Sequence, residues 1–211
     1  MAIHLVDHAE VMASRNRYAT WGGAKARLRP EVWPEIRPSF QIASRSKIFT
    51  IGSCFARNIE EHLQRMGCEI PTLAFEAPPA ETAGRRNSIL NKYTPLAILQ
   101  EVQWTSAIFR RDGLPRAEDS ENFCYHIGDD LVIDNNLDGF VPVTRRRFLE
   151  RRQQIYNVFK AVFSAQCVVI TAGTVESWYD AERDLYIQQV PIGRFPEITK
   201  NLKFAALDFD T

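Results

Sequence analysis

The sequence lacks several features that would assign a protein to a class at once. Its apolar runs stay well short of the roughly 20 residues that a membrane helix needs, and no charged segment followed by an apolar one opens the chain. The 26 basic residues are balanced by 26 acidic ones, so the overall charge indicates neither a nucleic acid nor a membrane surface as partner. These absences predict a cytoplasmic chain with no nucleic-acid and no membrane partner.

Cysteine and histidine are scarce, with four of each among the 211 residues. The cysteines form no CxxC pair and have no histidine at a metal-ligand spacing, which argues against the common zinc motifs and a secreted disulfide framework. We therefore expect reduced thiols, no metal site and no cofactor. Nothing in the sequence indicates the oligomeric state.

The sequence does contain enough apolar residues for a core. Its composition, 45% apolar and 25% charged, is typical of one globular domain with an extension. Residues 1–45 hold a Trp-Gly-Gly segment and three prolines, and we interpret them as an N-terminal extended arm with a short helix around 6–14. Residues 46–211 form, in this interpretation, one α/β domain.

Strand and helix patterns alternate along this domain. The β-branched segment 46–51 predicts a strand, and 54–66 predicts a helix that turns Phe55, Ile59, Leu63 and Met66 inward before Gly67. Further patterns predict strands over 68–75 and 167–171, helices over 93–107 and 144–165 with Thr144 as N-cap, and hairpins over 122–135 and 178–190. Apolar strands followed by glycine, with helices between them, predict a parallel sheet buried on both faces between helices.

Two glycine-containing turns follow the predicted parallel strands, Gly52-Ser53 and Gly173-Thr174. Ligands of such sheets bind beyond the carboxyl ends of the strands, where the strand order reverses. We therefore expect Ser53 and Gly173 on adjacent strands, with Cα atoms within roughly 10 Å. Ser53 would begin a helix, whose free N–H groups stabilise a developing oxyanion. The alternative interpretation is a plain turn in which Ser53 is only an N-cap.

The residues of both turns resemble a known family. The segment Ile51-Gly52-Ser53-Cys54-Phe55-Ala56 resembles the motif that names the GSCFA domain family, a bacterial branch of the SGNH/GDSL hydrolase-like group. The segment 173–178, Gly-Thr-Val-Glu-Ser-Trp, resembles that family's second signature, and the resemblance covers roughly residues 46–211.

The resemblance implies a three-layer α/β/α sandwich with a flavodoxin-like parallel sheet. It also implies that Ser53 is the counterpart of the SGNH nucleophile, and that the chemistry is acyl transfer through an acyl-enzyme. Related enzymes are esterases and O-acyltransferases that act on small-molecule or carbohydrate esters. The acyl group and its acceptor are not implied by these residues.

Several site roles stay open. Aligned on Gly52, a GDS motif places Cys54 in the nucleophile position, but free cysteine is usually buried, so we expect Ser53 to face the cleft and Cys54 to pack in the core. SGNH enzymes use an asparagine to donate a hydrogen bond to the oxyanion, and the matching position here is Val175, which has no polar group. The remaining candidate oxyanion donors are the side chains of Asn91 and Thr174 and the backbone N–H groups of Ser53 and Gly173. Gly52 shapes the same turn. Glu176 is a candidate site carboxylate.

The general base is missing from the sequence. SGNH enzymes take it from a late Asp-x-x-His, and no histidine follows His126. His62 is about 13 Å along the helix from Ser53 at 1.5 Å per residue, and His126 fits a structural role in a hairpin strand. We therefore expect a chain that is truncated at its C-terminus, or else a non-catalytic pseudo-enzyme that keeps the fold and binds a ligand.

The arginines of the 144–165 helix offer another open role. Three stand at 145–147 and two at 151–152. We expect this run to be a solvated helix face, with an acidic ligand as the alternative.

Overall fold

The computed structural model describes residues 3–7, 40–82, 85–139, 141–187 and 196–207. Most of the predicted N-terminal arm lies outside these ranges. The described elements, in chain order, are β1 (Ile3–Asp7), β2 (Ile48–Gly52), α2 (Cys54–Arg65), the 3-10 helices η3 (Pro71–Ala74), η4 (Pro79–Glu81) and η5 (Ser88–Leu90), α3 (Pro95–Arg111), η6 (Glu118–Phe123), β3 (Cys124–His126), β4 (Leu131–Asp134), β5 (Val143–Thr144), α4 (Arg145–Phe159), η7 (Lys160–Ser164), β6 (Cys167–Thr171), β7 (Glu176–Asp180), β8 (Leu185–Ile187), α5 (Pro196–Thr199) and β9 (Leu202–Leu207).

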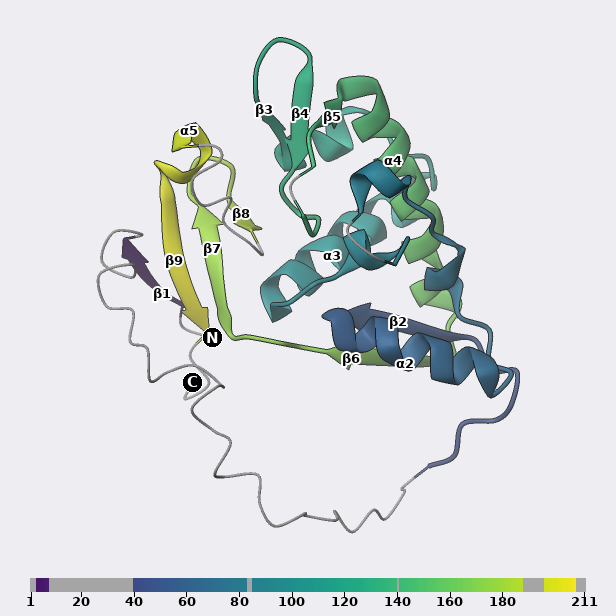
Figure 1. Cartoon of the computed structure of the whole chain (residues 1–211). Helices are drawn as coiled ribbons and strands as arrows, with labels where there is room; N and C mark the ends of the chain where they lie inside the picture. Colours follow the sequence, from purple (N-terminus) through teal and green to yellow (C-terminus); the bar gives the residue numbers. More distant parts are fainter. Residues whose placement is uncertain (1–2, 8–39, 83–84, 140, 188–195, 208–211) are drawn as a thin grey trace.

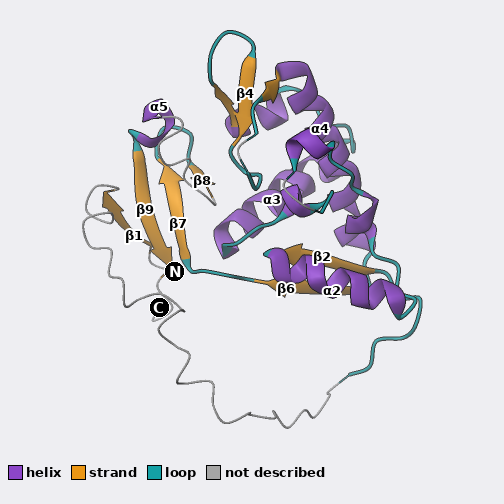
Figure 2. Ribbon diagram, viewed as in Figure 1, coloured by secondary structure: helices purple, strands orange, loops and turns teal. Residues whose placement is uncertain are grey.

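The strands form one parallel and two antiparallel sheets (Figures 1 and 2). β2 and β6 pair in parallel, β3, β4 and β5 form an antiparallel sheet, and β1, β9, β7 and β8 form a second one in that order. The predicted α/β class is therefore confirmed, with a parallel sheet of two described strands. In the part of the chain that the structure describes, no helix has both the length and the apolarity needed to cross a membrane.

The parallel pair lies between helices. α2 covers one face of β2 and β6, and on the other face Phe49 packs edge-on against Phe159 of α4, with 5.3 Å between ring centroids. All of β2 is buried. Val168 and Ile170 share the face of Phe49 because the strands are in register, yet they are 42% and 61% exposed. The prediction that both strands are buried on both faces is therefore wrong for β6, which has no described strand at its outer edge.

Two predicted elements differ from the structure. Residues 68–75 do not form a strand, because Pro71 lacks the N–H that a sheet ladder needs and starts the 3-10 helix η3 instead. Only Glu69 makes an isolated parallel bridge, to Lys47. The helix predicted around 6–14 is wrong for its first two residues, which belong to β1, paired antiparallel with β9. The rest of that prediction lies outside the described residues.

The buried face of α2 is largely polar, so the predicted inward apolar face is wrong for Phe55 and Met66, whereas Leu63 packs partly buried against the core. Phe55 and Met66 are 68% and 71% exposed, whereas Arg57 and Glu60 are buried. The Glu60 carboxylate accepts hydrogen bonds from Thr72 at 2.6 Å and Asn87 at 2.8 Å, and Arg57 pairs with it at 2.8 Å. Because these partners satisfy the charge, the helix can pack a carboxylate against the sheet.

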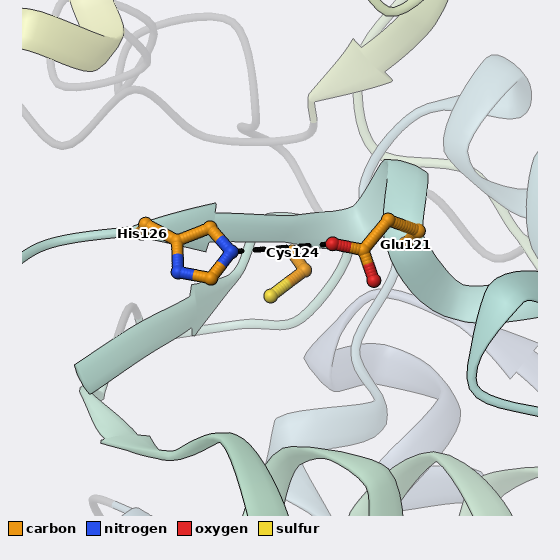
Figure 3. Close-up of side chains that lie close together, drawn as sticks. All are labelled: Glu121, Cys124 and His126. Carbon is orange, nitrogen blue, oxygen red and sulfur yellow. Dashed lines mark ion pairs between the residues drawn. The ribbon is translucent and has the colours of Figure 1, made fainter. Parts of the chain in front are cut away.

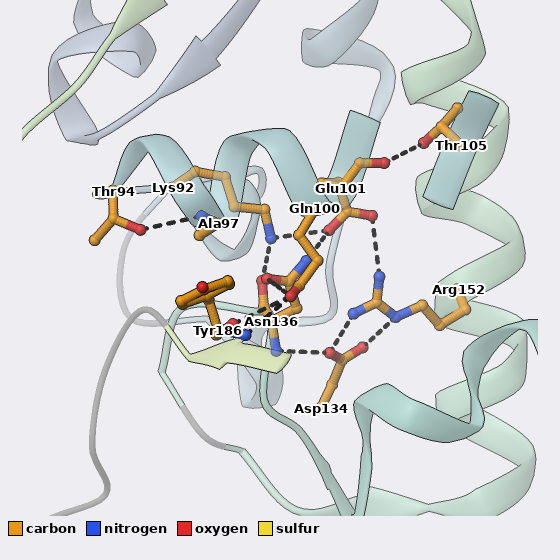
Figure 4. Close-up of polar contacts among 10 residues, drawn as sticks. All are labelled: Lys92, Thr94, Ala97, Gln100, Glu101, Thr105, Asp134, Asn136, Arg152 and Tyr186. Carbon is orange, nitrogen blue, oxygen red and sulfur yellow. Dashed lines mark hydrogen bonds and ion pairs between the residues drawn. The ribbon is translucent and has the colours of Figure 1, made fainter. Parts of the chain in front are cut away.

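A second buried charge network joins α3, α4 and β4 (Figure 4). Arg152 donates to Asp134 at 2.6 Å and to Glu101 at 3.0 Å, and Glu101 also pairs with Lys92 at 3.0 Å. All four side chains are at most 1% exposed. The neighbouring Arg151 is buried as well and pairs with Glu81 at 3.3 Å. The expectation of a solvated arginine face is therefore wrong for both.

The α4 helix itself follows the prediction closely. Thr144 caps it by accepting a hydrogen bond from the backbone N–H of Arg147 at 3.3 Å. The α-helical part ends at Phe159, and a 3-10 turn continues it to Ser164. The 122–135 hairpin is also confirmed, as β3 and β4.

Candidate functional site

The two glycine-containing turns meet at one edge of the parallel pair. Gly52 of β2 lies opposite Thr171 of β6, and the N–H of Ser53 donates to the carbonyl of Thr171 at 3.0 Å. A Cβ built on Gly173 would lie 3.8 Å from the Cβ of Ser53. The predicted adjacency of Ser53 and Gly173 is therefore confirmed.

A third segment, around residues 91–93, closes against both turns. Lys92 N–H donates to the carbonyl of Gly52 at 2.7 Å. The N–H groups of Gly173 and Thr174 both donate to the carbonyl of Tyr93, at 2.8 and 3.0 Å. Backbone hydrogen bonds therefore fix the spacing of all three segments, and the site is preorganised by the main chain.

Gly52 is required by its surroundings. Its φ is +145°, and an added Cβ would lie 2.2 Å from the carbonyl oxygen of Thr171. Gly67, at the end of α2, also has a positive φ of +87°, but an added Cβ there would meet nothing within 4 Å. An alanine at Gly67 would therefore meet only the strain of a positive φ, whereas an alanine at Gly52 would meet this strain and a steric clash.

We expect Gly52→Ala to lower the free energy of unfolding by about 3 kcal/mol or more, because strain and a backbone clash add. Gly67→Ala, which carries the strain alone, should cost about 1 kcal/mol. Urea unfolding of both variants measures the difference. Equal losses for the two variants would show that the end of β6 at Thr171 moves aside for the added Cβ, and that it does not fix the position of the Gly52 turn.

Ser53 is the N-cap of α2 and is buried. Its Oγ accepts from the N–H of Phe55 at 3.4 Å and lies 3.5 Å from Oγ1 of Thr171. The capping role that we offered as the alternative interpretation is thus present in the structure.

Cys54 is the first residue of α2, and its side chain is exposed. The expectation that Cys54 packs in the core is therefore wrong. Because Ser53 turns its side chain back to cap the helix, the next residue faces outward at the helix N-terminus. The structure exposes the thiol of this turn and buries the hydroxyl.

A cavity of about 450 Å³ opens beside Cys54. It lies between α2, residues 81–82 and 85–93, and residues 138–139 and 141 after β4. Most of its lining residues have polar side chains, among them two arginines and two carboxylates of opposite charge. The lining residues are Cys54, Arg57, Asn58, Glu81, Thr82, Arg85, Ser88, Asn91, Tyr93, Asp138, Gly139 and Val141.

Asn91, Tyr93 and Asp138 form a hydrogen-bonded group in the cavity wall. The hydroxyl of Tyr93 and the amide of Asn91 each donate to Oδ2 of Asp138 at 2.8 Å. Burial, followed by the hydrogen bond to Asp138, holds the pKa of Tyr93 well above its usual range. Tyr93 is therefore a neutral hydrogen-bond donor at physiological pH.

Two buried polar atoms of the lining lack a hydrogen-bond partner in the described structure. They are Oδ1 of Asn91 and Nε of Arg57, and both residues are at most 4% exposed. Nη1 of Arg57 likewise makes no hydrogen bond, but it forms an ion pair with Glu60. Buried polar groups without partners are rare, and they mark places where a ligand or water completes the network.

The other predicted site residues lie as follows. The N–H groups of Ser53, Gly173 and Thr174 already donate within the protein, and the Thr174 hydroxyl donates to the carbonyl of Glu176 at 3.2 Å. Glu176 begins β7 and is exposed, outside the cavity lining. The structure thus places Gly52, Ser53 and the 173–174 turn against the 91–93 segment. Of the predicted site residues only Asn91 lines the cavity, and Gly52, Ser53, Gly173, Thr174 and Glu176 do not.

Among the described residues, no histidine lines the cavity. His62 lies exposed in the last turn of α2, and His126 lies on β3. The cavity's own titratable oxygens are the carboxylates of Glu81 and Asp138 and the phenol of Tyr93. Sequence reasoning missed both Tyr93 and Asp138. The one available signal concerned Tyr93, which stands two residues after the candidate Asn91.

Comparison with known proteins gives one match. The GSCFA family model matches residues 47–209, which covers both turns and the cavity. No curated protein and no solved structure matches the chain.

Proposed function

The chain belongs to the GSCFA family, and we propose that its cavity is an acyl-transfer site of the SGNH-like esterase or O-acyltransferase type. The observation that supports this most is the exposed nucleophile of the Gly52–Cys54 turn. It stands at a helix N-terminus, at the carboxyl ends of two parallel strands and beside a cavity of about 450 Å³. Ligands of parallel α/β sheets bind at this place.

The reacting atom that we assign is Sγ of Cys54. The family motif favours Ser53, but Ser53 is buried and its Oγ caps α2, whereas Cys54 lines the cavity. A thiol is also the intrinsically stronger nucleophile of the two and depends less on a base. Ser53 is then a positioning residue that holds the turn.

The chemistry proceeds in two balanced steps. In the first, Sγ of Cys54 bonds to the ester carbonyl carbon, the C–O bond breaks, and the alcohol leaves with the thiol proton. In the second, water or another hydroxyl attacks the thioester and releases the acyl group, and the thiol regains its proton. The N-terminus of α2, where Cys54 stands, places the positive end of the helix dipole beside the developing oxyanion in both steps.

The lining favours a hydroxyl-rich ester such as an acylated carbohydrate. Side chains of Asn58, Thr82 and Ser88 offer donors and acceptors, and Oδ1 of Asn91 and Nε of Arg57 have places for one more bond. The placement of α2 on one face of the parallel pair and α4 on the other is consistent with the three-layer, flavodoxin-like sandwich that the proposal includes.

Mixing the chain with p-nitrophenyl acetate tests the proposal. We expect a burst of about one equivalent of nitrophenol per chain, followed by slow turnover, because no described histidine supports deacylation. Rapid steady turnover would instead show that a base lies within reach of the thioester.

A second candidate is a pseudo-enzyme that binds a ligand in the same cavity without reacting. The observation that favours it is the same lack of a histidine in the described lining. It predicts no burst, and protection of Cys54 from iodoacetamide by an acylated sugar. The presence or absence of the burst separates the two candidates.

A further inference from the structure

Three metal-ligand side chains gather where η6 meets β3 (Figure 3). The carboxylate of Glu121, the Sγ of Cys124 and a ring nitrogen of His126 all lie within 4.8 Å of one another. Nε2 of His126 is 3.9 Å from Oε1 of Glu121. None of the three lines the cavity beside Cys54, and β3 lies at the opposite end of the molecule from α2 in Figure 1, so this cluster is separate from the proposed acyl-transfer site.

Backbone geometry places the three on one side. Cys124 and His126 are two residues apart on β3, so their side chains leave the same face of the strand. Glu121 lies in the 3-10 helix η6 that runs directly into that strand. Cys124 is 2% exposed, whereas His126 and Glu121 are exposed. A buried sulfur at the base and two exposed ligands at the rim leave room for an ion to enter.

A cationic side chain already occupies this cluster. The guanidinium of Arg145 donates to Glu121 at 2.7 and 3.3 Å and contacts the Sγ of Cys124 at 3.7 Å. The place therefore stabilises positive charge. Arg145 starts α4 and is partly exposed, so its long side chain can swing into solvent when a smaller, more highly charged ion replaces it.

We propose that Glu121, Cys124 and His126 form an exchangeable site for a divalent cation of the zinc class, which Arg145 fills when the ion is absent. Thiolate, imidazole and carboxylate together are typical ligands of Zn²⁺, which takes four in a tetrahedron. Three protein ligands leave the fourth position to water. Binding releases the thiol proton to solvent, as metal binding to cysteine requires.

Titration of the full chain with Co²⁺ tests this site, because thiolate coordination produces a sulfur-to-cobalt charge-transfer absorption. We expect the band at one Co²⁺ per chain, and displacement by Zn²⁺. Cys124→Ser, which keeps the shape of this buried side chain, should remove the band. Cys167→Ser is the matched control, since Cys167 belongs to no such cluster among the described residues, and it should leave the band unchanged.

Two further variants test the geometry. His126→Ala should weaken the apparent Kd for Co²⁺ about tenfold or more, as a lost ligand does. Arg145→Gln should tighten it about tenfold, because the competing charged hydrogen bonds are gone. A band that survives Cys124→Ser, or no band at all at millimolar Co²⁺, overturns the site. An unchanged Kd in Arg145→Gln overturns the exchange with arginine.

Discussion

Cys54→Ala is expected to reduce the nitrophenol burst by about a thousandfold or more, because it removes the nucleophile itself. Ser53→Ala should keep a burst within about tenfold of the parent chain, and should lower the free energy of unfolding by about 1 kcal/mol through loss of the N-cap. The contrast rests on exposure, since the thiol lines the cavity and the hydroxyl is buried. Stopped-flow absorbance measures the burst.

Two controls accompany this comparison. Cys167→Ala removes a half-buried thiol of β6 and should leave the burst unchanged, which excludes a general thiol reaction. Thermal unfolding of each variant shows whether the fold is intact. If Ser53→Ala were inactive and Cys54→Ala active, the nucleophile would be the hydroxyl that the family motif implies, and the assignment to the thiol would be wrong.

Arg152→Met is expected to lower the free energy of unfolding by about 3–5 kcal/mol. The substitution keeps much of the side-chain volume but removes the cation that bonds Asp134 and Glu101. Lys92 then remains as the buried cation for two buried carboxylates. Equilibrium unfolding in urea measures the loss.

Arg146→Met on the same helix is the matched control. The Arg146 side chain is 89% exposed, and its pair with Glu150 at 3.4 Å lies on the surface. Its loss should change stability by no more than about 0.5 kcal/mol. A similar small loss for Arg152→Met would mean that water reaches the network and that the buried charges do not hold α3, α4 and β4 together.

Much of the local structure was predictable from short-range patterns. Thr144 before a helical pattern gave the start of α4, and the apolar 167–171 segment gave β6. Gly52 and Gly173 after apolar strands gave the adjacency of the two turns. These features depend on neighbouring residues, and capping and strand rules describe such neighbours well.

What the sequence did not reveal depends on long-range partners. Arg57 and Arg152 look like surface residues until Glu60, Glu101 and Asp134 are placed beside them. Hydrophobic periodicity therefore wrongly turned Phe55 and Met66 of α2 toward the core. The apolar run of β6 likewise cannot show whether a neighbour covers Ile170, which is exposed in the structure.

The candidate site was predictable in part for the same reason. Ser53 and Gly173 were named from turn signals, and the structure places them side by side. Asn91 was named as a substitute oxyanion donor, and it lines the cavity. The exposure of Cys54 was not foreseen, because burial statistics for cysteine ignore the outward turn that follows an N-cap. Cys124 and His126 share one strand face at a spacing that zinc motifs on loops do not use.

The most direct test of the proposed acyl-transfer site is the position of the acyl group on the chain after the first, acylating step. The chain would be mixed with p-nitrophenyl acetate, quenched in acid during the burst, digested and mapped by mass spectrometry. The account predicts one acetyl group, on Cys54, in an amount equal to the nitrophenol released. Acetylation spread over Cys167 and surface lysines, with Cys54 unmodified, would contradict it.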